Sequence, residues 1–315
     1  MSETSALLIE KDLLRSNVRR GMVLMATGVL MAPGIHAIAK GLGDILSPGQ
    51  LAWFRFFFQF IFLLPFVLIV NRGRLPRPSA THALRGLLLA MATLAFFWAL
   101  TYMPLADSAA IFFVEPLILT TMSAAFLGER IGRRRLLAVL VGFAGALIVI
   151  RPSFESVGLP ALLPLIAAAC FALYLTITRA AARTENATDM QFWVCVFGML
   201  VLSFAMAAST ATGWTTIRPT WPAKEVWAWL ILLGVIATIS HLLAIRAFRL
   251  APASILAPFQ YLEILGATFL GAFIFGDLPD GLTALGIAII VGAGLYVFQR
   301  EQRADAGPLP MESKE

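Results

Sequence analysis

The chain has 315 residues, of which 59% are hydrophobic and 13% are charged, with a formal net charge of +6. Soluble domains carry roughly 25% charged residues, and no water-soluble fold of this length hides so much apolar surface. The basic residues lie between apolar runs and not in one cluster, so we expect no nucleic-acid partner. Two cysteines, Cys170 and Cys195, exclude a disulfide scaffold or a Cys-x-x-Cys metal site, and no cofactor or metal is expected.

Continuous apolar runs of about 20 residues predict membrane-spanning helices, since a β-barrel would show short alternating segments. The predicted spans are 20–39, 50–70, 84–102, 107–127, 135–150, 159–180, 190–210, 226–247, 253–275 and 281–299. The predicted fold class is therefore an all-α integral membrane protein with ten transmembrane helices. The first 20 residues are charged and the first apolar run is long enough to span, so we expect no cleaved signal peptide.

The distribution of Lys and Arg predicts the orientation. Of the 24 basic residues, 19 lie on the side of both termini, four lie on the other side, and Arg55 alone is assigned to a span. Positive loops stay in the cytoplasm, so we expect both termini there, in a bacterial inner membrane. Residues 1–19 then form a cytoplasmic N-terminal segment and 301–315 a disordered cytoplasmic tail.

The chain also repeats itself. At a shift of 148 residues Glu115 falls on Glu263, which divides the chain into five-helix repeats at 20–152 and 153–300. Because five is odd, the second repeat crosses the membrane inverted. Inverted repeats are typical of secondary transporters, whose substrate site lies near the midplane between the halves. The alternative is a duplication that only built a stable scaffold.

At a shift of 139 residues Lys40 falls on Arg179. Lys40 ends the first span on the outer side, and Arg179 ends the sixth on the inner side. An alternating-access carrier needs closure at each mouth, so we predict that these two residues act in gating. For Lys40 the alternative is snorkelling to the membrane interface.

Glu115 and Glu263 each lie near the middle of a predicted span. A charge there costs at least about 2.5–3.5 kcal/mol, so each should face a cavity or a partner. We predict a proton or cation site formed by the pair; the alternative is a packing hydrogen bond to a neighbouring helix. Pro116 and Pro258 free backbone carbonyls near these acids and allow the helices to kink.

Other polar residues are candidates for substrate binding. Gln260 lies one turn before Glu263 and shares its face. Arg55 either binds a substrate carboxylate or neutralises a buried acid. His36 shares a face with Lys40, which suits capture of an anion. His241 gives its span a polar turn, as either a binding or a packing histidine.

Three aromatic residues are further candidates. Trp98 and Tyr102 lie one turn apart and would form a wall that accepts a cationic or flat substrate. The alternative for them, and for Tyr174 on the sixth span, is the aromatic belt at the membrane interface.

The last span of each repeat has a stripe of small residues, which permits close helix contact and a possible homodimer. The stripes are Ala138, Gly142 and Ala146 in the first repeat and Ala284, Ala288 and Gly292 in the second. We expect no substrate contact from these spans.

No enzyme motif survives inspection. Gly41-Leu42-Gly43-Asp44 matches the Gly-x-Gly-Asp string of intramembrane proteases, but a second aspartate deep in a span is missing. The chain also lacks His-Glu-x-x-His, Gly-x-Ser-x-Gly and a Walker loop, so we expect no enzyme activity.

Several short motifs carry a family resemblance: Leu127-Gly128-Glu129 closing the fourth span, Gly142–Gly145, and Arg151-Pro152. With ten predicted spans in two halves, they resemble the drug/metabolite transporter superfamily, EamA type. A second set is similar to the branch that includes bacterial S-adenosylmethionine uptake carriers: Phe54–Phe58, His82–Leu89, Pro258–Glu263 and Gly276–Asp280. The chain departs from that branch at Gln260, Glu115 and His36, where relatives tend to carry Arg, an apolar residue and an acid.

We therefore expect a secondary, alternating-access transporter whose partners are the lipid bilayer and a small polar metabolite. The resemblance favours an amino-acid derivative such as S-adenosylmethionine, whose sulfonium suits the carboxylates and whose carboxylate suits Arg55 or Lys40. The alternatives are an organic anion, dicarboxylate or amino-acid carrier of the same fold, which Arg55, His36 and Lys40 would serve. A non-transporting membrane receptor or a channel is the alternative of a different class.

Overall fold

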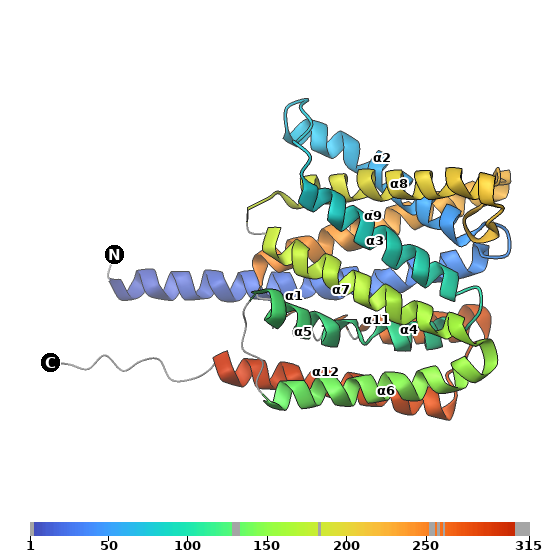
Figure 1. The fold of residues 1–315 in the computed structure, drawn as a ribbon. Helices are drawn as coiled ribbons and strands as arrows, with labels where there is room; N and C mark the ends of the chain where they lie inside the picture. Colours follow the sequence, from blue (N-terminus) through green and yellow to red (C-terminus); the bar gives the residue numbers. More distant parts are fainter. Residues whose placement is uncertain are drawn as a thin grey trace.

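The computed structural model describes residues 3–127, 133–181, 184–251, 256, 259–260 and 262–305. Within these ranges every regular element is a helix (Figure 1). The α-helices are α1 (Glu3–Leu42), α2 (Pro48–Val70), α3 (Ala80–Ala99), α4 (Leu105–Phe112), α5 (Glu115–Leu127), α6 (Arg133–Val157), α7 (Leu163–Ala181), α8 (Ala187–Thr212), α9 (Trp227–Leu250), α11 (Leu262–Leu270) and α12 (Gly281–Asp305).

Shorter helical elements complete the described chain. Three are 3₁₀ turns, η1 (Leu159–Leu162), η2 (Thr215–Ile217) and η3 (Lys224–Val226). A π-helix, η5 (Gly271–Phe275), continues α11.

The composition of these helices fits a lipid environment. Six of the described helices are long and apolar enough to cross a membrane, and three shorter apolar helices accompany them. Large apolar side chains point outward on several of them: Phe66 is 61% exposed, Phe204 79% and Phe273 80%. In lipid the backbone must satisfy its own polar groups, which a helix does, and outward phenylalanines face hydrocarbon. The chain is a multi-pass membrane protein.

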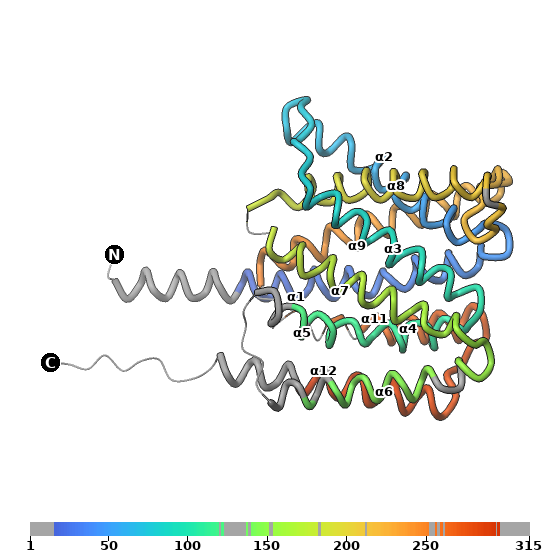
Figure 2. The backbone as a smooth tube through the Cα atoms, viewed as in Figure 1, coloured from blue at the N-terminus to red at the C-terminus, as the bar shows by residue number. Residues whose placement is uncertain are grey.

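The helices run along one common direction and form a bundle (Figure 1). We call the end where α1 begins and where α7 and α9 end the inner end, and the end where α1 stops the outer end. α12 runs back toward the inner end, as the backbone trace also shows (Figure 2). α6 and α12 pack against each other at one edge of the bundle, and a Cβ on Gly145 would meet the Gly286 carbonyl at 3.1 Å.

The predicted span 107–127 is wrong as a single helix. It consists of α4 and α5, with Phe113 and Val114 between them. Pro116 is the cause, because proline offers no N–H to the carbonyl four residues earlier and its ring crowds that carbonyl. Consequently Glu115 lies in the first turn of a half-helix. Glu263 likewise lies in the first turn of α11. Residues 253–255, 257, 258 and 261 of the predicted span 253–275, including Pro258, lie outside the described residues.

Other boundaries differ less. α1 begins at Glu3 and not near residue 20, and it continues through Pro33 without a break. α12 ends at Asp305, five residues into the tail expected at 301–315, and residues 306–315 lie outside the described residues.

The two stripes of small residues have different surroundings. Gly142 packs on Leu117 and Ala146 is buried inside the chain. Ala284, Ala288 and Gly292 are exposed on α12. Of the stripe residues whose burial the structure describes, only those on α12 are exposed to a second copy, and the homodimer stays a prediction.

Candidate functional site

A central cavity with about 1050 Å³ of empty space, its open mouth included, lies inside the bundle. Its described walls come from α1, α2, α3, α4, α5, α7, α9, α11 and Gln260, and none of the described lining residues belongs to α6, α8 or α12. The cavity extends from His36, in the outer half of α1, toward Met25 and Phe248 at the inner end. Side chains from both predicted repeats meet there.

Arg55 is held rigidly in the cavity wall. It is 5% exposed on α2 and donates to the Thr93 hydroxyl on α3 and, at 3.1 Å, to His241 Nε2 on α9. His241 Nδ1 lies 2.9 Å from the Ala237 carbonyl, so its N–H must sit on Nδ1 and the ring is neutral. Arg55 makes no ion pair with any acid in the described ranges. A substrate carboxylate is therefore the partner that its position suits.

Glu115 faces the same cavity from the start of α5. Its side chain is 3% exposed, and Oε1 has no hydrogen-bond partner among the described residues. Arg179 lies at the end of α7 with its guanidinium 5.5 Å from the Phe248 ring. The Glu115 carboxylate could therefore bind a cationic group in the cavity.

Glu263 is engaged differently. Its Oε1 lies 3.2 Å from His36 Nε2, and the His36 ring packs 4.4 Å from that of Phe96. Gln260 also lines the cavity, with a buried Oε1 that has no partner in the described chain. The structure thus brings His36, Gln260 and Glu263 together in one wall.

Lys40 lies outside the cavity, at the outer end of α1. Its Nζ is 2.5 Å from Asp277 Oδ2 and 5.1 Å from the centre of the Phe275 ring. Sequence reasoning did not name Asp277 as a partner. No sequence signal pointed to this pair, because Lys40 and Asp277 are 237 residues apart and belong to different predicted repeats.

The aromatic candidates separate into two groups. Tyr174 is 1% exposed, lines the cavity, and donates its hydroxyl to Gln191 Oε1 at 3.3 Å. Trp98 and Tyr102 lie instead in a different pocket at the outer surface, where Trp98 Nε1 is 3.4 Å from the Tyr102 hydroxyl. The structure does not bring these two into the central cavity.

Sequence reasoning missed Arg85, which it counted as a loop residue. Arg85 is 0% exposed on α3; it donates from Nε to the Thr178 hydroxyl at 3.0 Å and lies 5.5 Å from the Tyr174 ring. Its two terminal nitrogens have no partner among the described residues. The available signal was its position inside the predicted span 84–102.

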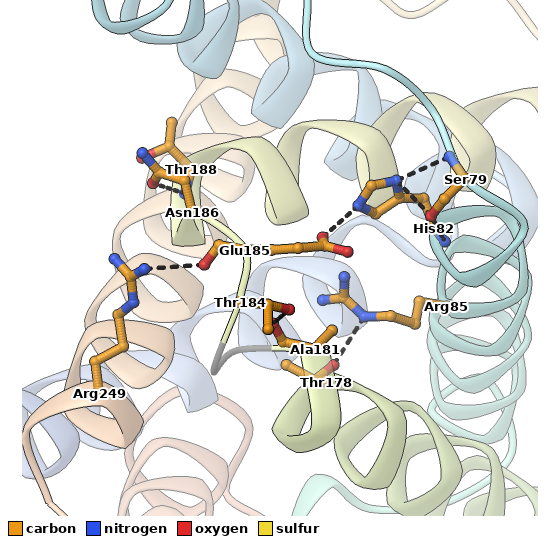
Figure 3. A network of polar contacts seen from close by, with 10 residues as sticks. All are labelled: Ser79, His82, Arg85, Thr178, Ala181, Thr184, Glu185, Asn186, Thr188 and Arg249. Carbon is orange, nitrogen blue, oxygen red and sulfur yellow. Dashed lines mark hydrogen bonds and ion pairs between the residues drawn. The ribbon is translucent and has the colours of Figure 1, made fainter.

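Arg85 belongs to a polar network at the inner end (Figure 3). Its guanidinium lies between Thr178 and the side chain of Glu185, which pairs with His82 at 2.6 Å. Arg249 at the end of α9 donates to the Glu185 carbonyl at 2.9 Å. The network joins α3, α7, α9 and the α7–α8 loop.

The bundle, its lipid-facing surface and a largely apolar central cavity that contains charged side chains define a multi-pass membrane transporter. The chain belongs to the EamA-like transporter family, which matches residues 19–151 and 158–299. It is not an enzyme.

Named relatives agree with this class. The chain is 31% identical over 269 residues to the S-adenosylmethionine uptake transporter of Rickettsia bellii, covering 85% of this chain and 89% of the relative. It is 28% identical to the riboflavin transporter of Brucella anthropi, covering 80% and 88%. It is 27% identical to the pseudopaline exporter CntI of Pseudomonas aeruginosa, covering 90% and 95%.

A solved structure titled "Crystal structure of protein" has the same fold. It superposes with a TM-score of 0.63 at 19% identity and covers 90% of this chain and 98% of its own. The family match and the named relatives, and not this likeness of fold, identify the chain as a transporter of a small metabolite.

Proposed function

We propose that this protein is a secondary transporter of the bacterial inner membrane that moves a small polar organic metabolite by alternating access. It crosses the membrane ten times as two inverted five-helix repeats, with both termini in the cytoplasm. The observation that carries the proposal is a shared central cavity, to which described residues of both predicted repeats contribute charged side chains. Alternating access requires a shared site of this kind near the midplane.

The polar groups of the cavity fit a substrate with both a negative and a positive group. Arg55 offers a fixed guanidinium whose Nε has no partner in the described chain, and Glu115 offers a buried carboxylate oxygen. S-adenosylmethionine has the matching groups, an amino-acid carboxylate and a sulfonium, and the relative from Rickettsia bellii is named for its uptake. We propose an amino-acid derivative of this kind as the substrate.

The mouths of the cavity are closed in turn. Lys40 closes the outer one through its 2.5 Å pair with Asp277. Arg179 serves the inner one, at the end of α7 where the cavity reaches Phe248. The half-helices α4, α5 and α11 let the chain rearrange without breaking long helices.

Counterflow of labelled S-adenosylmethionine into proteoliposomes tests the proposal. Wild-type protein should accumulate label. Arg55→Ala should lose accumulation at least about tenfold, the equivalent of about 1.4 kcal/mol. Arg74→Ala, the same change at an exposed arginine between α2 and α3, should accumulate like the wild type.

Other outcomes point elsewhere. Accumulation of a labelled dicarboxylate that needs Arg55 but survives Glu115→Gln would replace the proposed substrate with an organic anion. The chain is a receptor or a channel if two results coincide. Folded, reconstituted protein would move neither label in counterflow, and Glu115→Gln and Glu263→Gln would change no measured activity.

A further inference from the structure

The two cavity acids are repeat mates, yet they have unequal surroundings. Both lie in the first turn of a half-helix. Glu263 already has a partner, because its Oε1 lies 3.2 Å from His36 Nε2. Glu115 is 3% exposed, and its Oε1 has none among the described residues. Equivalent positions therefore present one engaged and one available carboxylate.

The difference between the surroundings of Glu115 and Glu263 follows from the sequence and does not depend on one conformation. The shift of 139 residues that pairs Lys40 with Arg179 places His36 on Leu175. Leu175 lines the cavity and is 6% exposed, but its side chain forms no hydrogen bond. The second repeat thus has no imidazole at the position equivalent to His36, so Leu175 cannot do for Glu115 what His36 does for Glu263.

His36 also belongs to the contact that closes the outer end. α1 contacts α11 through the pair of His36 and Glu263. One turn further out, Lys40 of α1 pairs with Asp277, which follows η5. Between these helices a Cβ on Gly266 would lie 2.7 Å from Pro33, so the two backbones are already in close approach. Outward opening must separate α1 from α11, and it must break the pair that holds Glu263.

We infer that the two acids have different tasks: Glu115 binds the positive group of the substrate, and Glu263 is a latch that keeps the outer end closed through His36. This inference rests on the proposed function and deepens it. The positive group is of the sulfonium or ammonium class.

Thiol labelling separates the two tasks without any substrate. Cys170 and Cys195 are replaced by alanine, and Ala32→Cys in the cavity wall serves as the reporter. A membrane-impermeant methanethiosulfonate is applied from the outer side of oriented vesicles. Glu263→Gln and His36→Asn should each label at least about tenfold faster than the parent, a shift of about 1.4 kcal/mol in the opening equilibrium.

Matched variants make the labelling decisive. Glu115→Gln is the same change at the repeat mate, and it should label at the parent's rate, as should Glu225→Gln at an exposed acid. The double variant His36→Asn/Glu263→Gln should label no faster than either single variant, because one pair is lost in all three. Equal acceleration by both cavity variants, or none by Glu263→Gln, would overturn the latch. Size-exclusion profiles of each purified variant show that it is folded.

Equilibrium binding of labelled S-adenosylmethionine in detergent tests the other half. Glu115→Gln should weaken binding at least about tenfold, and Glu263→Gln should stay within about threefold of the wild type. Unchanged binding in Glu115→Gln, or equal losses in both, would overturn the assignment of the cation to Glu115. If the wild type binds no S-adenosylmethionine, the proposed substrate and this role of Glu115 fall together, while labelling still decides the latch.

Discussion

The two ends of the bundle are held by different kinds of contact. At the outer end one helix, α1, makes two direct pairs with acids, at 2.5 and 3.2 Å. At the inner end His82 pairs with Glu185 at 2.6 Å, but Arg85 beside them keeps two terminal nitrogens without a partner among the described residues. An unsatisfied buried cation is costly. The outer end is thus closed by satisfied pairs, whereas a rearrangement of the inner end could lower the free energy by giving the Arg85 guanidinium further partners.

The largest effect is expected from reversing the outer pair. Lys40→Glu places two carboxylates where the structure has a 2.5 Å ion pair. We expect outside labelling of Ala32→Cys to rise at least about tenfold, the equivalent of about 1.4 kcal/mol or more. Adding Asp277→Lys restores the pair and should bring the rate back. A single reversed variant that labels like the parent would show that Lys40 does not hold the outer end.

Removing the incompletely paired Arg85 at the inner end should not lower the Tm, in contrast to removing Lys40 at the outer end. Arg85→Met fills the same space with an apolar chain and removes a charge that is 0% exposed. We expect the Tm in detergent to be unchanged or raised by a few degrees, whereas Lys40→Met should lower it. A greater loss in Arg85→Met would mean that its bonds to Thr178 and Tyr174 outweigh its unmet nitrogens.

A smaller effect is expected from the inner pair itself. The Glu185 side chain is 32% exposed, so solvent screens its pair with His82. Glu185→Gln should change labelling of Ala32→Cys from the inner side by less than about fivefold, or about 1 kcal/mol. Inside-out vesicles carry this measurement. A change as large as that of Lys40→Glu would make the two ends energetically alike.

The smallest effect concerns pH. Asp280 lies at the surface before α12, and the Thr283 N–H donates to it at 2.7 Å, which holds the pKa of its carboxyl below the ordinary value. A lowered pKa contributes stability above the ordinary value, about 3.9, and that stability is lost as pH falls through the folded pKa. The Tm difference between wild type and Asp280→Ala should therefore be present at neutral pH and shrink in strong acid. A Tm difference of the same size at neutral pH and in strong acid would contradict this role of Asp280.

Much of this architecture could be predicted from sequence because hydropathy and proline act locally. Apolar runs indicate helices, and Pro116 beside Glu115 indicates a weak point in its span. The sequence also placed both acids on the cavity side, since a mid-membrane carboxylate tolerates few other positions.

The rest depends on which distant helix covers each face. Nothing in the sequence placed Asp277 against Lys40 or Glu263 against His36, because helix tilt and rotation set those distances. Trp98 shows the same limit: Phe96 and Phe97 line the cavity, yet the residue after them turns to the outer surface. Arg85 was counted as a loop residue because it lies at the edge of the predicted span 84–102, and its contacts with Thr178 and Tyr174 on α7 follow only from the packing of distant helices.

The separation of α6 and α12 from the cavity has an evolutionary consequence. Among the described residues these two helices contribute nothing to the cavity wall, and they pack on each other. Mutations that alter cargo choice and mutations that disturb the supporting pair therefore fall on different residues. Side chains that line the cavity can therefore change during evolution while the packing of α6 against α12 is kept. Relatives of recognisable sequence similarity are named for S-adenosylmethionine, riboflavin and pseudopaline, a range of cargo that such a separation would permit.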